Sequence, residues 1–325
     1  MKFILFVLFL CFLRYATYVP QRELKGGETV VITNATSDIG WVTALELNKK
    51  GVFVYAGVLD EGTGKKLQEA ATNQSALKPI ILDVRNPKSI KDAVELVKTE
   101  LGESKGLVGL VNNAALLSPF SDFTETSAAT WQETFAVNVV SVVETTRAFI
   151  PLLQKGSGSL IFHSTVLGTL GLPFSTANSA TSYALQGFVD SLRREVAPVG
   201  VKVSLVTSNM PEPQFMEYSA QVNAELCAQQ VQHRSHVARL LLTPLLSLAD
   251  PATVGTALAD AATAIVPNAR YNVNLGAAVL SVLPSIVSDW VLALAVANAE
   301  RCSGLLAPPA SGAKGDEKRG THREL

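Results

Sequence analysis

The sequence predicts a doubly wound α/β fold, with a mostly parallel, Rossmann-like sheet in a single domain. Short apolar runs rich in β-branched residues recur along the chain, and amphipathic helical segments alternate with them. Strands that are apolar throughout are typical of parallel sheets covered on both faces. In such sheets ligands bind beyond the carboxyl ends of the strands, so we expect functional residues in the turns that follow strands.

The expected elements follow one another regularly along the middle of the chain. The first helix opens after a polar turn, at Ile39, and should stop at Gly51, because glycine readily ends a helix. Later helices are expected at about 87–101, 128–153 and 179–197. Strands are expected at 29–33, 52–56, 79–84, 107–113, 159–164 and 201–206.

Both ends of the chain differ in composition from the middle. Residues 3–13 are wholly apolar, but this segment is shorter than the roughly 20 residues needed to cross a bilayer. We expect a membrane anchor or signal-like segment with its linker over 1–25 and the main domain over 26–302. Residues 303–325 contain few apolar side chains and are expected to form a disordered polar tail.

Charge and metal-ligand spacing exclude several classes of function. The chain has 27 Lys and Arg against 28 Asp and Glu without a basic cluster, so no nucleic-acid partner is expected. The three cysteines are far apart and predict neither a disulfide framework nor a zinc site. His233 and His236 are spaced for one helix face, but no third ligand accompanies them, so no metal is expected.

Several segments carry a family resemblance. The stretches GLVNNAA (109–115), FVDSLRREV (188–196) and GVKVSLV (200–206) resemble the short-chain dehydrogenase/reductase family, and the similarity runs from about residue 28 to about 300. The chain looks most like the membrane-associated retinol and hydroxysteroid dehydrogenase branch. The resemblance implies NAD or NADP as cofactor, a hydrophobic small molecule as ligand, location at the endoplasmic reticulum membrane, and homo- or hetero-dimers.

The first turn departs from the family pattern T-G-x-x-x-G-x-G. In TNATSDIG, Thr33 and Gly40 are retained, while Asn34 and Asp38 replace the first two glycines, and Ile39 lies between Asp38 and Gly40. Asparagine tolerates the left-handed backbone that glycine would adopt. A carboxylate beside the cofactor diphosphate costs about 3 to 4 kcal/mol per charge pair at an effective dielectric of about 20. Alternatively, Asp38 caps the helix that opens at Ile39.

At other positions that the resemblance implies are in contact with the cofactor, the residues of the family are kept. Asp83 and Val84 match the pair that flanks the adenine, and Asn112 and Ala114 match the stretch after the fourth strand. The asparagines of that stretch also brace the sheet, so their retention fits cofactor binding and architecture equally. Gly57 ends the second strand where an acidic residue would favour NAD, and no arginine is expected nearby to bind a 2′-phosphate, so NAD is slightly favoured.

The resemblance implies a catalytic tyrosine, a lysine four residues later on the same helix face, a serine and an asparagine. Asn138 matches the asparagine, and Thr165, three residues before Gly168, matches the serine. Thirteen residues after Thr165, where the tyrosine is due, stands Asn178, and the lysine position is Ser182. The segment FVDSLRREV fixes this register.

Tyr183 is not expected to replace the missing tyrosine. Its helical neighbours at i−4 and i+4 are Ser179 and Gly187, and the sequence has no lysine between residues 156 and 201. A residue adjacent to the lysine position also points about 100° away around the helix. We therefore interpret Tyr183 as a packing aromatic.

Three hypotheses follow from these positions. The first is a short-chain dehydrogenase scaffold that has lost most hydride-transfer activity and serves in binding or oligomerisation, with weak or vestigial cofactor binding. The alternative is an active NAD(P)-dependent oxidoreductase of hydrophobic alcohols or ketones, such as retinoids or steroids, with a rearranged site. A third is a lipid-binding module that keeps the apolar pocket without cofactor.

Overall fold

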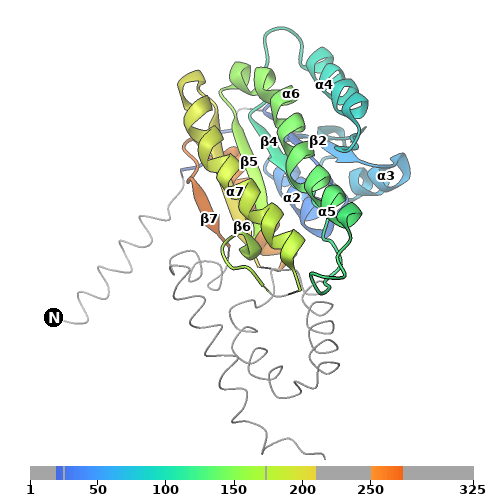
Figure 1. Ribbon diagram of the computed structural model, residues 1–325. Helices are drawn as coiled ribbons and strands as arrows, with labels where there is room; N and C mark the ends of the chain where they lie inside the picture. Colours follow the sequence, from blue (N-terminus) through green and yellow to red (C-terminus); the bar gives the residue numbers. More distant parts are fainter. Residues whose placement is uncertain (1–19, 25, 173, 210–249, 274–325) are drawn as a thin grey trace, which may run out of the picture.

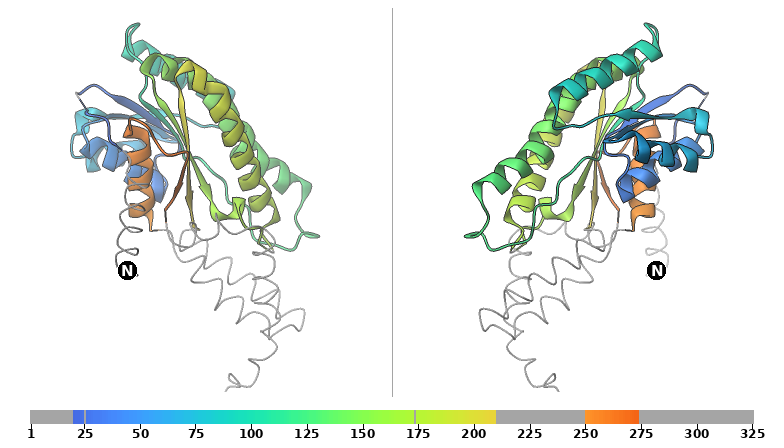
Figure 2. Two further views of the ribbon diagram at one scale, coloured as in Figure 1. Left: turned by 90° about the vertical axis from the view of Figure 1, so that its left-hand side faces the viewer. Right: turned by 90° about the vertical axis from the view of Figure 1, so that its right-hand side faces the viewer.

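A computed structural model of the protein describes residues 20–24, 26–172, 174–209 and 250–273. They form one parallel sheet of seven strands in the order β3-β2-β1-β4-β5-β6-β7, with helices on both faces (Figures 1 and 2). The expected doubly wound, Rossmann-like fold in a single domain is confirmed. Residues 1–19 of the anchor or signal-like segment expected over 1–25, the polar tail over 303–325, all three cysteines and the His233–His236 pair lie outside the described residues.

The seven strands pair in parallel throughout and vary in length from three to seven residues. They are β1 (Thr29–Ile32), β2 (Phe53–Val58), β3 (Leu77–Ile81), β4 (Gly109–Asn112), β5 (Ser159–Thr165), β6 (Lys202–Ser208) and β7 (Arg270–Asn272). The α-helices of the described residues are α2 (Asp38–Lys49), α3 (Glu61–Ala70), α4 (Pro87–Leu101), α5 (Ala128–Phe135), α6 (Ser141–Gly156), α7 (Thr176–Val196) and α10 (Pro251–Thr263).

The six strands and four helices expected from the sequence are present, with small shifts at their ends. Helix α4 shows why its ends were predictable, because Asn86 caps its first turn, Pro87 follows, and Gly102 continues the chain at φ 72°. Helices α3 and α10 and strand β7 were not predicted. Helix α3 is polar and contains two glycines, and β7 has only three residues with no apolar run.

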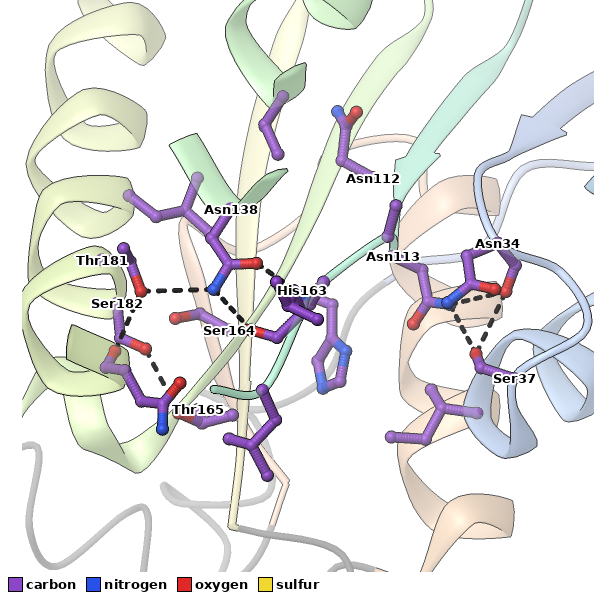
Figure 3. A pocket seen from close by; sticks show the side chains of 18 of the residues that line it. Asn34, Ser37, Asn112, Asn113, Asn138, His163, Ser164, Thr165, Thr181 and Ser182 are labelled. Carbon is purple, nitrogen blue, oxygen red and sulfur yellow. Dashed lines mark hydrogen bonds between the residues drawn. The ribbon is translucent and has the colours of Figure 1, made fainter. Parts of the chain in front are cut away.

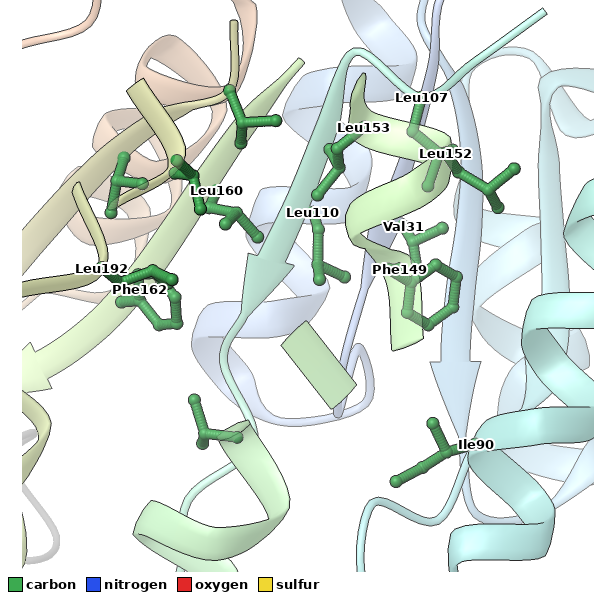
Figure 4. Packing of buried hydrophobic residues seen from close by; sticks show 14 of the residues in the cluster. Val31, Ile90, Leu107, Leu110, Phe149, Leu152, Leu153, Leu160, Phe162 and Leu192 are labelled. Atoms are coloured by element: carbon green, nitrogen blue, oxygen red, sulfur yellow. The ribbon is translucent and has the colours of Figure 1, made fainter. Parts of the chain in front are cut away.

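Two apolar layers hold the helices against the sheet. On one face, α2 and α10 pack together around residues such as Leu47 and Leu258, with α2 over β2 and α10 over β4, β5 and β6. On the other face, α4, α6 and α7 cover the sheet, and Phe149, Leu153 and Phe162 are fully buried there (Figure 4). Each fully buried side chain of this size contributes about 1.5–3 kcal/mol.

Helices α5 and α6 form one continuous helix that contains a π turn at Ala136–Val140. A single π turn inside an α-helix frequently marks a functional site, and this one contains Asn138. The helix Ala128–Gly156 is the one in the described chain that is long and apolar enough to cross a membrane. It packs instead against α4 and the sheet with its apolar face, so we interpret it as a core helix.

Candidate cofactor and substrate site

The larger of two neighbouring cavities, with a volume of about 350 Å³, lies at the carboxyl ends of β1, β4 and β5 (Figure 3). Its walls come from the turn before α2, the loop after β4, the π turn and the first turns of α7. This is the edge of the sheet where the fold places ligands. Of the described side chains that line it, only those of Asp38 and His163 ionise readily in water.

The turn after β1 is built around Asn34 and Ser37. Asn34 has φ 50°, the left-handed conformation that the sequence predicts for an asparagine in place of glycine. The Ser37 hydroxyl donates to the Asn34 carbonyl at 3.0 Å and accepts from the Gly40 amide at 3.1 Å. The alternative in which Asp38 caps the helix is therefore wrong: Ser37 is the cap, and Asp38 is the first helical residue, with an exposed side chain.

Close packing explains why Gly40 and Thr33 are retained. A Cβ added at Gly40 would lie 2.3 Å from the Asn34 carbonyl oxygen and 2.8 Å from Asn113 Nδ2. The Thr33 hydroxyl oxygen accepts from the amides of Asn113 and Ala114, both at 2.9 Å. Thr33 and Gly40 do not line the larger cavity. Their positions tie the turn after β1 to the turn after β4.

The N-terminus of α2 is partly suited to a diphosphate. The amides of Asp38 and Ile39 have no acceptor among the described residues, and both residues line the cavity. Free amides at a helix N-terminus favour an anion. The Asp38 carboxylate opposes this, but its exposure to solvent means that screening keeps the penalty below the 3 to 4 kcal/mol expected from sequence. The residues present therefore fit a dinucleotide with a weakened diphosphate site.

The smaller cavity, of about 210 Å³, adjoins the first along β2 and β3. Asp83 and Val84, expected at the adenine, line it together with Gly57 and Ala114. At Gly57 an added Cβ would approach the Ile32 carbonyl oxygen to 2.7 Å, so the close packing of the strands excludes a side chain there.

Arg85 corrects the expectation that no arginine stands near the cofactor ribose. It lines the smaller cavity and binds Asp83 through Nε and Nη2, each 2.9 Å from a carboxylate oxygen. These hydrogen bonds lower the pKa of the Asp83 carboxyl below its usual range. The guanidinium is therefore already paired, and the local residues do not decide between NAD and NADP.

The four positions expected at the catalytic centre line the larger cavity together: Asn138, Thr165, Asn178 and Ser182. Asn138 binds the backbone of Leu116 from both ends of its amide, with Oδ1 accepting at 2.7 Å and Nδ2 donating at 2.8 Å. The hydroxyl oxygens of Thr165 and Ser182 are 3.4 Å apart. The assignment of a catalytic role to each position stays a prediction.

Asn178 is occupied by structural hydrogen bonds. It lies in the first turn of α7, is 3% exposed, and its amide accepts from the amide and hydroxyl of Ser118 and donates to the Ser118 carbonyl. An amide is not an acid in water, and here its donors and acceptors are engaged with the loop after β4. Asn178 consequently has no proton to transfer to a ligand.

Tyr183 is directed away from this centre. Its side chain is 47% exposed, its hydroxyl donates to the Thr169 carbonyl, and it does not line the cavity. The placement agrees with its interpretation as a bystander.

His163 is not singled out as a site residue by the sequence alone. It lies in β5, after the apolar run and two residues before Thr165. Side chains two residues apart on a strand point to the same face of the sheet, so this alternation could have placed His163 beside Thr165. Its Nε2 is 3.0 Å from the Ser208 hydroxyl oxygen, and burial lowers the pKa of its imidazole to about 4. The ring is therefore neutral at physiological pH.

The fold and the position of the cavities are those of the doubly wound, Rossmann-like class of α/β proteins. Residues 28–222, more than half of the chain, match the sequence profile of the short chain dehydrogenase family. The chain belongs to this family, whose members bind NAD or NADP.

Named relatives are similar over different shares of the chain. It is 36% identical to the D-beta-hydroxybutyrate dehydrogenase, mitochondrial, of Rattus norvegicus over 193 residues, which cover 58% of this chain and 56% of that protein. It is 31% identical to 17-beta-hydroxysteroid dehydrogenase type 6 of Bos taurus over 281 residues, or 81% of this chain and 87% of that one. The match to the hydroxybutyrate enzymes thus spans about half their length.

Solved structures extend the similarity of the fold. A short-chain dehydrogenase from Streptomyces avermitilis has a TM-score of 0.65 at 22% identity, covering 87% of this chain and all of that one. The structure described as ElxO with NADP bound has a TM-score of 0.63 at 20% identity, covering 78% of this chain and 99% of that one. At these identities the likeness supports the fold alone.

Proposed function

We propose that the protein binds a nicotinamide dinucleotide and an apolar small molecule in the larger cavity, and that it transfers hydride slowly or not at all. The observation that carries this proposal is the pair Asn178 and Ser182. Among the residues that the structure describes, no lysine, arginine or tyrosine lines the larger cavity. Oxidation of an alcohol by hydride transfer requires a group that takes up the hydroxyl proton, and a positioned acid or base contributes about two to four decades of rate.

The remaining polar groups are poor substitutes for that acid or base. The hydroxyls of Thr165 and Ser182 ionise far above neutral pH, although they can hydrogen-bond a ligand oxygen. Asn138 and Asn178 are amides bound to the loop after β4. Imidazole is the usual general base near neutral pH, but the lowered pKa of His163 makes it a weak one. The site thus favours binding over proton transfer.

A second candidate is the active oxidoreductase of hydrophobic alcohols or ketones. Its support is that the relatives are dehydrogenases by name, of hydroxybutyrate, hydroxysteroids and retinol. Nothing in these similarities indicates a loss of activity, so they favour this candidate over the first, while the geometry at Asn178 and Ser182 favours the first.

Two measurements on the full-length protein separate these candidates. NADH and NADPH are titrated by fluorescence, and turnover of a secondary-alcohol panel that includes a hydroxysteroid and a retinol is followed at 340 nm. The first candidate predicts nucleotide binding with turnover at least about two decades below that of an active relative. Turnover comparable with that relative would overturn it in favour of the second, and failure to bind either nucleotide would contradict both.

Membrane association and dimer formation are further parts of the proposal. Support comes from the apolar run at 3–13 for the membrane, and from the branch of the family that the sequence resembles for the endoplasmic reticulum. Flotation with phosphatidylcholine vesicles, compared between the full chain and a chain lacking residues 1–19, tests membrane binding. Light scattering in detergent tests dimerisation, and a monomer at micromolar concentration would contradict it.

A further inference from the structure

His163 stands between the two halves of the larger cavity. The turn with Asn34 and Ser37 lies on one side of its ring, and Asn138, Thr181 and Ser182 lie on the other (Figure 3). A dinucleotide reaching from the α2 N-terminus towards Thr165 has to pass this ring. The position is therefore suited to a contact with the nicotinamide end of the cofactor.

The hydrogen bonds of Ser208 determine which ring nitrogen of His163 carries the proton. The Ser208 hydroxyl has one hydrogen, which it donates to the Asn209 carbonyl at 3.0 Å. Its contact with His163 Nε2, also at 3.0 Å, then requires Nε2–H to be the donor. In a neutral imidazole this leaves Nδ1 unprotonated, with a lone pair to accept a hydrogen bond.

The accepting nitrogen has no partner among the described residues, and His163 lines the larger cavity. Burial holds the pKa of the ring at about 4, so Nδ1 keeps its lone pair at every pH above about 5. An acceptor that is fixed in orientation and unpaired requires a donor from whatever fills the cavity. A ligand that fills the cavity without such a donor displaces water from this nitrogen and leaves it unsatisfied, which lowers the affinity.

We propose that His163 Nδ1 accepts a hydrogen bond from the carboxamide N–H of a nicotinamide dinucleotide, and that His163 is thereby a specificity-determining residue for the cofactor. The inference rests on the proposed dinucleotide binding. The carboxamide is the donor attached to the ring that must approach Thr165. The ribose hydroxyls lie closer to the diphosphate, and the adenine amino group belongs in the smaller cavity with Asp83.

An analogue that lacks only the donor tests the inference. In reduced 3-acetylpyridine adenine dinucleotide, a methyl group replaces the carboxamide NH₂ and the carbonyl remains. Calorimetric titration of the unmodified full-length protein should give about tenfold tighter binding of NADH than of this analogue, the worth of one buried hydrogen bond. In His163→Leu the NADH affinity should fall about tenfold and the affinity for the analogue should not.

Control variants separate this contact from a general loss of structure. Ser204→Ala removes another buried hydroxyl, which lies on β6 and donates to the Asn268 carbonyl. This variant should leave the ratio of the two affinities unchanged. His163→Gln, which supplies an amide oxygen as acceptor, should restore part of the preference. Equal loss of both affinities in His163→Leu, or equal binding of both nucleotides by the unmodified protein, would overturn the inference alone. Absence of any nucleotide binding would overturn the proposed function as well.

Discussion

Asn178 and Ser118 are joined by three hydrogen bonds, of 2.8 and 2.9 Å to Asn178 Oδ1 and of 3.0 Å from its Nδ2 to the Ser118 carbonyl. Both residues are buried, at 3% and 4% exposure. The residue at the expected tyrosine position therefore fastens α7 to the loop after β4. It stabilises the wall of the cavity.

Asn178→Ala should destabilise the protein by about 2–4 kcal/mol, because it leaves the amide and carbonyl of Ser118 buried without partners. The free energy of unfolding in urea is the measurement, with nucleotide absent. Ser118→Ala removes only the hydroxyl contact and should cost about 1 kcal/mol. A loss below 1 kcal/mol in Asn178→Ala would mean that water replaces the bonds, and that the link is not structural.

Hydride transfer should increase only in part when the tyrosine and lysine alone are introduced. In Asn178→Tyr with Ser182→Lys the acid is supplied, but the Asp38 carboxylate still opposes the diphosphate. Adding Asp38→Gly should raise kcat/KM for a secondary alcohol at least about tenfold over the double variant. Tyr183→Phe in the same background should change nothing. Full activity in the double variant would show that Asp38 does not weaken cofactor binding.

Asp38→Asn should strengthen NADH binding about tenfold at low ionic strength, with a smaller gain at 1 M salt, because the carboxylate is exposed and screened. Fluorescence titration at both salt concentrations gives the comparison. Glu46→Gln removes one charge from the same helix without lining either cavity, so its effect should be small. A salt-independent gain would point to the shape of the residue and not to its charge.

Because the His163 imidazole is buried in its neutral form, the protein should be less stable in mild acid. Its folded pKa, about 4, lies below the ordinary value of 6.5, so between these values the unfolded chain binds a proton that the folded chain does not. Stability should fall as the pH decreases from 6.5 to 4, by at most about 3 kcal/mol. Urea unfolding of the unmodified chain and of His163→Leu should diverge in this window. Parallel curves would contradict the shift.

Gly40→Ala and Gly187→Ala should have opposite effects on stability. The Gly40 position places a Cβ against the Asn34 carbonyl at 2.3 Å, so the turn has to move and we expect a loss of about 1–3 kcal/mol. Gly187, on the outside of α7, has nothing within 4 Å, and alanine should gain about 0.5–1 kcal/mol there. Thermal unfolding of both variants gives the comparison. Equal changes would mean that the turn adapts.

The sequence predicted the fold well because its central strands are apolar throughout and its helices are bounded by caps such as Asn86 and Gly102. Elements without such signals, β7 and α3, were missed, and so was α10, although Asp250 caps its first turn. In the site, spacing brought Asn138, Thr165, Asn178 and Ser182 to the right cavity. Spacing could not reveal which side chains bind each other or which way they point. It did not show that Ser37 and not Asp38 caps α2, that Arg85 binds Asp83, or that His163 faces the cavity.

The link between Thr33 and the amides of Asn113 and Ala114 changes how the preserved residues of this chain are to be understood. It fastens the end of β1 to the end of β4, two strands that lie side by side and are about 80 residues apart in the sequence. A chain that no longer needs hydride transfer still needs this fastening in order to fold. Selection for folding alone would therefore keep Thr33, Asn113 and Gly40 while positions 178 and 182 lose the tyrosine and lysine of the family, and a sequence comparison would count the three kept residues as a surviving cofactor motif.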